Sequence, residues 1–485
     1  SNQPSSISAL GGLTAELDKL SPRFEIDASQ IEILKTPSEF YEVLKFKISH
    51  AKRRIFLSTL YIGKTEHELI STLHAALKRN PDLKLSILTD ALRGTRESPN
   101  PSCASLLAPL ISEFGPRVEI RMFHTPNLTG IRKALVPKRI NEGWGLQHMK
   151  LYGIDDELIM SGANLSDDYF TNRQDRYHVF SSAAVTAYFA RVHHAVSSLS
   201  FQVHPSPTEA GYTLTWPSTN PSPSPLSNPH AFRTAATHEL TPLLHPPAPP
   251  TASKSQTLLY PLLQFTPVLT PDSSTELPAL TALLTSLRAP PFGPSSRWTF
   301  TAGYFNMTPS FRDMLLSSRP GRATVIAAAP EANGFFNSGG VSGLLPAAYT
   351  HLSRKFVEAA SAAGLASNIT LKEWRRGTVG TPGGWTYHAK GIWAWLPGEA
   401  GDAGPSVSVV GSSNFTARSY GLDLEAGVCV VTADEGLRKR LAGEVEHLES
   451  WAEPVGEFEF ERVERRVGPH VRLAMWIVKV LGGAL

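Results

Sequence analysis

The chain has 485 residues, of which 41% are hydrophobic and 18% charged, a composition typical of a globular protein with substantial cores. Its formal net charge is only +3, which argues against a dedicated nucleic-acid-binding protein, since such proteins carry a strong basic excess. Two cysteines, Cys103 and Cys429, are too few for a disulfide framework or a cysteine-rich zinc site. No apolar run approaches about 20 residues, so we expect no membrane-spanning helix.

The first part of the chain alternates between strand-like and helix-like patterns. Residues 1–23 are polar and small, and we expect them to be loosely ordered. From residue 24 onward, runs of apolar and β-branched residues predict strands at 53–63, 83–91 and 118–125, and helical periodicity predicts a helix at 67–79. This alternation predicts an α/β fold for residues 24–204.

The composition changes sharply at residue 205. Pro, Ser and Thr dominate residues 205–257, and we interpret this segment as a long linker with little regular structure. The alternation then resumes, with strands expected at 297–307, 323–331 and 368–376 and helices at 311–319 and 343–364. The chain therefore divides into a first half (24–204), a linker, a second half (258–466) and an amphipathic C-terminal segment (467–485).

The two halves repeat one pair of residues, a histidine followed two positions later by a lysine. The first copy is His148 with Lys150, and the second is His388 with Lys390. Residues two apart on a strand face the same side, so we expect each imidazole to lie beside an ammonium group. One such pair occurs by chance in many proteins, so the repetition carries the signal.

The residues that follow each pair match as well. Asn164 lies 16 residues after the first histidine and Asn414 lies 26 after the second, and an acid, Asp175 or Glu425, lies 11 residues after each asparagine. A longer hairpin turn at 397–406 explains the wider spacing in the second copy. A duplicated hydrophobic core does not need matched polar residues. We therefore interpret each copy as part of a phosphate site that contains a nucleophile.

These motifs resemble those of a known superfamily. HMKLYGID (148–155) and YHAKGIW (387–393), each followed by a glycine and an asparagine, are similar to the paired His-Lys-Asp motifs of the phospholipase D superfamily. The segments 123–130, 145–177, 328–336 and 385–393 more narrowly resemble the eukaryotic mitochondrial CDP-diacylglycerol–glycerol-3-phosphate 3-phosphatidyltransferases. The resemblance implies two pseudo-symmetric α-β-α halves with mixed sheets and an active site at their interface.

The resemblance also implies a reaction, the transfer of a phosphatidyl group from CDP-diacylglycerol to glycerol 3-phosphate with release of CMP. A neutral imidazole would attack phosphorus to form a phosphatidyl-histidine, and the other histidine would act first as acid and then as base. We assign His148 as the nucleophile and His388 as the acid/base, although the reverse assignment fits the sequence nearly as well. Asp175 and Glu425 would accept a hydrogen bond from the far ring nitrogen of a histidine.

The residues expected to bind phosphate carry cationic, amide or phenol donors. The main candidates are Lys150, Lys390, Asn164 and Asn414. For a second group a purely structural role is an equally good interpretation: Arg93, Arg96, Arg173, Tyr61 and Tyr304. Because the clamp is already cationic, we expect neither a metal ion nor a cofactor.

Two motifs need a separate interpretation. Trp395 stands where the second copy should have the counterpart of Asp155, which implies that Asp155 supports the hairpin turn or orients a lysine. Gly63-Lys64-Thr65 resembles the end of a P-loop, but Ser58 stands where the leading glycine should be. We therefore do not predict ATP binding.

A lipid substrate requires contact with a membrane, and two segments suit an anionic membrane surface. The preferred segment, 127–145, carries Arg132, Lys133, Lys138, Arg139 and Trp144. The second, 471–485, carries Trp476 and fits a terminal helix that caps the core equally well. The resemblance implies a mitochondrial protein held peripherally on the inner membrane.

Two other functions are open at this point. A phospholipase or a nucleic-acid phosphodiesterase would use water in place of glycerol 3-phosphate, although the low net charge disfavours nucleic acid as a partner. A membrane-binding protein without activity is disfavoured because both His-x-Lys pairs are intact.

Overall fold

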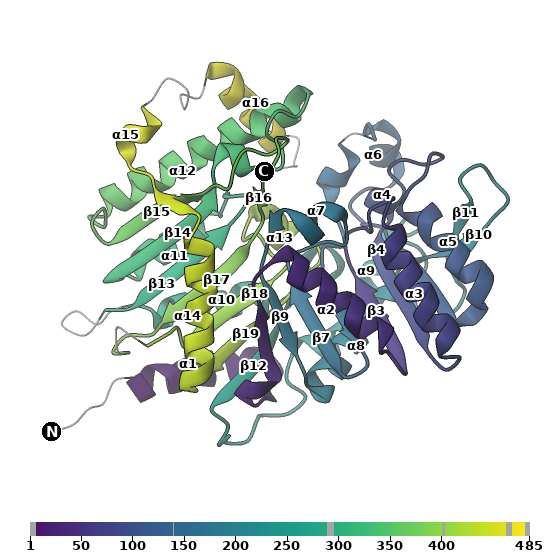
Figure 1. The fold of residues 1–485 in the computed structure, drawn as a ribbon, viewed down its shortest axis with the longest axis horizontal. Coiled ribbons are helices and arrows are strands. Elements are labelled where there is room, and N and C mark those ends of the chain that lie inside the picture. The colour runs from purple at the N-terminus through teal and green to yellow at the C-terminus, as the bar shows by residue number, and fades with distance from the viewer. Residues whose placement is uncertain (1–5, 139, 289–294, 400–402, 462–467, 481–485) are drawn as a thin grey trace.

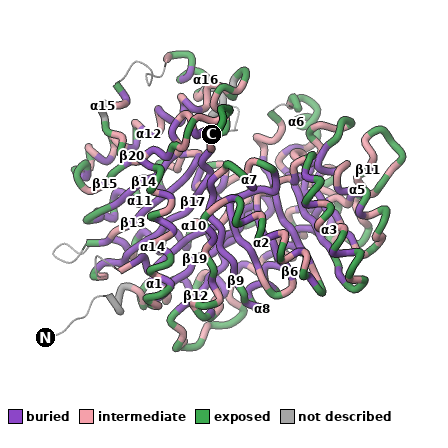
Figure 2. The backbone as a smooth tube through the Cα atoms, viewed as in Figure 1, coloured by how far each residue is buried: buried purple, intermediate pink, exposed green. Residues whose placement is uncertain are grey.

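The computed structural model describes residues 6–138, 140–288, 295–399, 403–461 and 468–480. Two nine-stranded mixed sheets lie next to each other, each covered by helices (Figure 1). The buried backbone follows the strands of both sheets, while the exposed backbone lies in helices and loops around them (Figure 2). The predicted α/β architecture of two α-β-α halves is confirmed.

The first sheet is built around three parallel strands followed by three antiparallel ones. Its strands are, in chain order, β2 (Ile31–Leu34), β3 (Arg54–Ser58), β4 (Lys84–Asp90), β5 (Val118–Phe123), β6 (Leu151–Ile154), β7 (Glu157–Ser161), β9 (Tyr177–Phe180), β10 (Phe201–Pro205) and β11 (Tyr212–Thr215). Their spatial order is β2-β9-β7-β6-β3-β4-β5-β10-β11.

The second sheet repeats the order and direction of eight of these strands, while β11 has no counterpart and an additional strand lies at the opposite edge. Its strands are β1 (Phe24–Glu25), β12 (Thr257–Gln264), β13 (Arg297–Ala302), β14 (Arg322–Ala328), β15 (Ile369–Trp374), β17 (Lys390–Trp395), β18 (Val407–Gly411), β19 (Glu425–Thr432) and β20 (Ala452–Pro454). Their order is β1-β12-β19-β18-β17-β13-β14-β15-β20, so β6 and β17, which follow the two His-x-Lys pairs, occupy equivalent positions. Each half therefore presents its motif at the same place in its sheet.

Helices cover the outer faces of both sheets. Those on the first are α2 (Pro37–Ser49), α3 (His67–Arg79) and α5 (Cys103–Phe114), and those on the second are α10 (Glu276–Ser286), α11 (Pro309–Ser317) and α12 (Leu345–Ala362). The predicted helix at 67–79 shows why: Leu69, Leu73 and Leu77 recur every four residues and are fully buried. Each leucine buried in this way contributes about 1.5–3 kcal/mol relative to an exposed one.

A third hydrophobic core joins the two halves. It contains strand residues of both sheets, such as Met160 and Val428, together with α8 (Ala183–Ser197), α9 (Pro229–Leu244) and α14 (Glu435–Glu449). The buried Arg176 of the first half also pairs at 2.7 Å with the buried Glu444 of α14 in the second half. The halves are therefore packed as one unit.

Short elements complete the fold. They are α4 (Ala91–Gly94), α6 (Gly130–Leu135), α7 (Asp167–Thr171), α13 (Ala417–Gly421), α15 (Glu457–Phe460), α16 (Pro469–Val480) and the paired strands β8 (Arg173–Gln174) and β16 (Thr386–Tyr387). The β8–β16 pair is parallel and crosses between the halves.

Two expectations about loosely ordered segments are wrong. Residues 6–20 form the helix α1 (Ser6–Leu20), whose Leu13 and Leu17 are fully buried in the core that contains α10. The expected linker contains β11 and the sixteen-residue α9, which starts with Asn228 as its N-cap and Pro229 at its first position. Four apolar residues of α9 at helical spacing are buried, so burial outweighed the Pro- and Ser-rich composition. The strand β1 of the first half also joins the edge of the second sheet.

Candidate active site

The first histidine is fixed beside the acid of the second half. The backbone N–H of His148 donates to the carbonyl of Leu424 at 2.9 Å, and Leu424 directly precedes Glu425. The ring Nδ1 of His148 lies 2.9 Å from Glu425 Oε2, and the hydroxyl of Ser412 donates to the same carboxylate oxygen. Burial lowers the pKa of His148 below its ordinary value, although Glu425 opposes this shift. Burial raises the pKa of Glu425, but the charge of His148 and its hydrogen bond outweigh burial and lower it.

The second histidine has the reciprocal arrangement. The backbone N–H of His388 donates to the carbonyl of Gln174 at 2.8 Å, and its ring Nδ1 lies 2.6 Å from Asp175 Oδ2. Lys390 Nζ lies 2.9 Å from the same ring nitrogen and 3.8 Å from Asp175. Burial and the charge of Lys390 lower the pKa of His388 to about 3, so the imidazole is neutral at neutral pH. Each half thus supplies the acid that orients the other half's histidine.

Glycine at position 162 allows Lys390 to approach. A Cβ atom on Gly162 would lie 2.7 Å from Lys390 Nζ and 2.8 Å from Asp175 Oδ1, both too close for any side chain. Lys150 donates from Nζ to the carbonyl of His148 at 2.8 Å. Burial, followed by the charge of Lys390, lowers the pKa of Lys150 to about 7. The ammonium groups of Lys150 and Lys390 therefore repel each other electrostatically across the boundary between the halves.

Aromatic residues surround His388. The ring of Tyr169 lies edge-on to the imidazole at 5.2 Å, with its hydroxyl 3.5 Å from Nε2, and the ring of Tyr304 lies edge-on at 5.5 Å. The guanidinium of Arg173 stacks 4.6 Å from the Tyr169 ring and pairs with Asp168 at 3.0 Å. Tyr304 therefore lies beside His388, and Arg173 lies beside Tyr169, while their role in binding phosphate stays a prediction. Tyr304 follows β13 instead of lying inside the expected strand at 297–307.

The two asparagines differ in their contacts. Asn164 Oδ1 accepts from the Leu60 backbone N–H and the Thr59 hydroxyl, each at 3.3 Å, and its Nδ2 donates to Tyr169 at 3.3 Å. Asn414 Oδ1 is buried without a hydrogen-bond partner among the residues that the structure describes. The side chain of Asn414 is therefore the more available of the two to a ligand.

Comparisons with known proteins decide the family. No protein-family model matches the chain. The chain is 44% identical over 474 residues to the CDP-diacylglycerol–glycerol-3-phosphate 3-phosphatidyltransferase of Saccharomyces pastorianus, which covers 95% of this chain and 89% of the relative. The chain belongs to this phosphatidyltransferase family. The Homo sapiens phosphatidyltransferase, named mitochondrial, is 34% identical over 95% of this chain and 84% of its own length.

A solved structure supports the same fold. The phosphatidylserine synthase of Haemophilus influenzae Rd KW20 superposes with a TM-score of 0.71 over 97% of this chain and 98% of that chain, at 18% identity. At that identity the likeness establishes a shared fold.

Asp155 lies outside the two histidine–acid pairs. It occupies the two-residue turn between β6 and β7 with a φ of 51°, and its carboxylate accepts from the backbone N–H groups of Lys52, Arg53 and Arg54 at 2.8–3.2 Å. At the equivalent turn, Trp395 stacks on Arg297 at 4.1 Å. Asp155 therefore supports the turn, one of the two roles that the missing counterpart at Trp395 implied, and it is not a catalytic residue.

Of the remaining residues expected to bind phosphate, Tyr61 and Arg93 contact each other, whereas Arg96 does not join them. Tyr61 follows β3 and contacts Ser166 at 3.2 Å, and the guanidinium of Arg93 stacks 3.9 Å from its ring. Arg96 is exposed and pairs with Glu142 at 2.6 Å. The structure thus associates Arg93 with Tyr61 and engages Arg96 in a surface ion pair.

The helices α6, with Arg132 and Lys133, and α16, with Trp476, both lie in the upper part of the view in Figure 1. Arg132, Lys133 and Lys138 are exposed, and Arg132 stacks 4.4 Å from Trp144. Trp476 in α16 is 62% exposed, whereas Arg139 lies outside the described residues. No helix within the described ranges is long and apolar enough to cross a bilayer.

Sequence reasoning missed two residues of the site, Tyr169 and Ser412. Tyr169 lies five residues after Asn164, but the same position of the second half is Ser419, so comparing the repeats gave no signal. Ser412 aligns with Gly162, and that mismatch inside a matched motif was the available clue that the two half-sites differ.

Proposed function

We propose that the protein transfers the phosphatidyl group of CDP-diacylglycerol to glycerol 3-phosphate, giving phosphatidylglycerophosphate and CMP. This is the first committed step toward phosphatidylglycerol and cardiolipin. The names of the relatives support the donor and the acceptor. The observation that carries the mechanism is the exchange of acids between the halves, because it orients both imidazoles at one boundary.

In the first step, His148 acts as the nucleophile. Its Nδ1–H donates to Glu425, which leaves the Nε2 lone pair free to attack the phosphorus that carries the diacylglycerol. The bond from phosphorus to the CMP oxygen breaks, and a phosphatidyl-histidine remains. CMP leaves as a phosphate monoester anion, whose second pKa is about 6, so its departure needs little help from an acid. This fits a neutral His388 at the start of the reaction, so we propose His388 as a base alone and withdraw the acid role expected from the sequence.

In the second step, His388 acts as the base. Its imidazole accepts the proton of the 1-hydroxyl of glycerol 3-phosphate as that oxygen attacks phosphorus. The bond between phosphorus and His148 breaks, and phosphatidylglycerophosphate is released. His388 then returns the proton to solvent, and Asp175 stabilises the transient imidazolium.

The phosphate clamp consists of Lys150, Lys390 and the asparagines. Two buried ammonium groups stabilise the extra negative charge that develops on the non-bridging oxygens in both transition states. The unpartnered side-chain oxygen of Asn414 can only accept a hydrogen bond, so its role as a further donor to phosphate rests on the amide nitrogen. Tyr304 and Arg173 complete the wall beside His388.

Peripheral contact with an anionic membrane brings the lipid to this site. Basic residues and exposed apolar ones alternate in the 127–145 segment, where Ile131 is 79% exposed and Leu135 75%. On α16, Leu473 and Trp476 are 56% and 62% exposed. Relatives from mouse, cattle and human are named mitochondrial, which supports a mitochondrial location, and we place the protein on the inner membrane.

The test supplies CDP-diacylglycerol in detergent micelles together with labelled glycerol 3-phosphate. We expect a labelled lipid and an equal amount of CMP, and we expect His148→Ala and His388→Ala each to abolish both products. Phosphatidic acid in place of the labelled lipid would show a hydrolase and overturn the proposal.

A further inference from the structure

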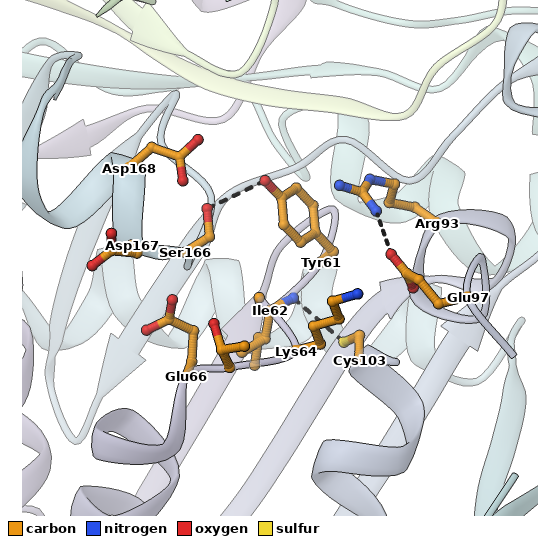
Figure 3. A pocket seen from close by; sticks show the side chains of 12 residues that line it. Tyr61, Ile62, Lys64, Glu66, Arg93, Glu97, Cys103, Ser166, Asp167 and Asp168 are labelled. Carbon is orange, nitrogen blue, oxygen red and sulfur yellow. Dashed lines mark hydrogen bonds and ion pairs between the residues drawn. The ribbon is translucent and has the colours of Figure 1, made fainter. Parts of the chain in front are cut away.

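A small pocket lies beside the histidine site, on the far side of Tyr61. It has a volume of about 220 Å³ and is formed by the loop after β3, the start of α3, the α4 segment and the start of α7. Figure 3 shows Tyr61 and Arg93 above Lys64, with Glu66 and Asp168 on the opposite side of the pocket. Neither histidine lines it, so the pocket adjoins the histidine site without including it.

The pocket carries one cationic side chain without a counter-ion. Lys64 has no hydrogen bond or ion pair within the part of the chain that the structure describes, and it is exposed at the pocket wall. Arg93 stacks 3.9 Å from the Tyr61 ring, and its nearest carboxylate oxygen, on Glu97, is 3.6 Å away. Glu97 also lines this side, and a second carboxylate, on Glu142, lies 3.9 Å from Arg93. A phosphate here would therefore bind Lys64 directly and share Arg93 with these acids.

The opposite side carries carboxyl groups that suit hydroxyls. Glu66 is 7% exposed, and burial raises its pKa to about 7, so near neutral pH its carboxyl group both donates and accepts hydrogen bonds. Asp168 also lines this side and pairs with Arg173 at 3.0 Å. Because Arg173 stacks on Tyr169, whose hydroxyl is 3.5 Å from His388 Nε2, the pocket is linked to the base by one short chain of contacts.

We propose that this pocket binds the acceptor, a small polyol phosphate, with Lys64 and Arg93 on its phosphate and Glu66 on a hydroxyl. The inference rests on the proposed function and deepens it by naming the acceptor subsite. It also gives a role to Gly63-Lys64-Thr65, which is not a P-loop.

The volume of the pocket favours the smaller acceptor over the larger nucleotide donor. A volume of about 220 Å³ is below the ~300–1,000 Å³ typical of pockets for drug-sized ligands. It suits a three-carbon phosphate better than a cytidine nucleotide, although both carry phosphate. The experiment must therefore distinguish the two phosphate sources.

The decisive variant is Lys64→Ala, with Lys78→Ala as its matched control. Lys78 is an exposed lysine in the last turn of the same helix that begins beside the pocket, and it does not line the pocket. Initial rates are measured with glycerol 3-phosphate, with glycerol, and with varied CDP-diacylglycerol. Exchange of labelled CMP into CDP-diacylglycerol without acceptor reports the first half-reaction alone.

Lys64→Ala should raise the KM for glycerol 3-phosphate about tenfold, the effect of losing one charge-assisted hydrogen bond at a partly solvated site. It should reduce the preference for glycerol 3-phosphate over glycerol by the same factor. The KM for CDP-diacylglycerol and the CMP exchange should change less than about twofold. Lys64→Arg should restore most of the preference, because a cation is kept.

Two results would overturn the assignment. If Lys64→Ala behaves like Lys78→Ala with both acceptors, the pocket does not bind the acceptor phosphate. If the KM for CDP-diacylglycerol rises as much as that for glycerol 3-phosphate, the pocket binds the donor. A wild-type protein with neither transfer nor exchange would instead contradict the proposed function itself.

Discussion

The two half-sites share a histidine–acid pair but differ in what surrounds it. In the His148–Glu425 pair, the hydroxyl of Ser412 donates to the acid. In the His388–Asp175 pair, glycine replaces that serine and Lys390 lies 2.9 Å from the imidazole instead. Duplication therefore kept the pair that orients each ring, while the neighbouring residues diverged.

The two histidine side chains also differ in how far they are exposed to solvent. The side chain of His148 is 12% exposed, whereas that of His388 is 6% exposed and lies between Tyr169 and Tyr304. An open imidazole suits attack on a bulky lipid phosphate. The enclosed imidazole of His388 is neutral and has a lone pair free to accept a proton, while burial and Lys390, which lower its pKa to about 3, weaken it as a base. A pseudo-symmetric fold can therefore hold two chemically different histidines.

The largest expected effect comes from breaking either pair. Asp175→Asn and Glu425→Gln keep the side-chain size but remove the negative charge that selects the ring tautomer and stabilises an imidazolium. We expect kcat to fall about 10²–10⁴-fold in each variant. Steady-state transfer assays measure the fall, and circular dichroism checks the fold.

The two variants should differ in the step they impair. Glu425→Gln should slow the burst of CMP release, whereas Asp175→Asn should keep the burst and slow the second step. Equal bursts in both would contradict the division of roles between the half-sites.

A second prediction concerns the contact that joins the halves. Glu444 is buried and accepts hydrogen bonds from Arg176 at 2.7 Å, His178 at 2.7 Å and Trp393 at 2.8 Å. Glu444→Ala leaves the Arg176 guanidinium buried and unpaired, so we expect the free energy of unfolding to fall by about 3–5 kcal/mol. Urea denaturation measures it. Glu446→Ala, at an exposed position of the same helix, should change it by less than about 0.5 kcal/mol.

A third prediction concerns how the charge of Lys150 depends on pH. With a pKa of about 7, Lys150 is charged below neutral pH and loses its charge as pH rises, so kcat/KM for CDP-diacylglycerol should fall above about pH 7. Lys150→Arg keeps the charge, and the loss between pH 7 and 8.5 should be roughly tenfold smaller. Superimposable pH profiles of the wild type and this variant would rule Lys150 out as the source of the alkaline limb.

The smallest expected effect concerns the membrane. Replacing Ile131 and Leu135 of α6 by glutamate should weaken cosedimentation with phosphatidylglycerol-containing vesicles about fivefold or more, because exposed apolar area is lost beside basic residues. Trp476→Ala tests α16 in the same assay. Phe46→Glu is the control, since Phe46 is 62% exposed on α2, away from α6 and α16 (Figure 1). Unchanged binding in the α6 variant would remove that segment from the proposed membrane surface.

The sequence predicted much of the fold because the same pattern occurs twice. Strand and helix periodicity predicted the bounds of β4, α3, α11 and α12. Each predicted end lies no more than two residues from the observed one. The spacing of histidine, lysine, asparagine and acid identified both pairs. In α9, by contrast, the helical spacing of Phe232, Ala236, Leu240 and Leu244 was present in the sequence but was masked by the surrounding prolines.

Other features depend on contacts that no local pattern contains. Glu425 serves His148 only because Leu424 pairs with Gln147 across the boundary, which places the acid of one half beside the histidine of the other. Asn164 looked equivalent to Asn414, but its amide oxygen is already bound by the Leu60 backbone. Such differences arise from the packing of two diverged halves, and a comparison of the repeats cannot reveal them.

We propose that His148 and His388 act in turn on one phosphorus, and this can be tested by trapping the covalent intermediate. CDP-diacylglycerol labelled in the phosphatidyl phosphate is mixed with the His388→Ala variant without acceptor, quenched at alkaline pH and mapped by peptide mass spectrometry. The account predicts a phosphatidyl group on His148 and one equivalent of CMP released. A label on any other residue, or none in this variant while His148→Ala becomes labelled on His388, would contradict it.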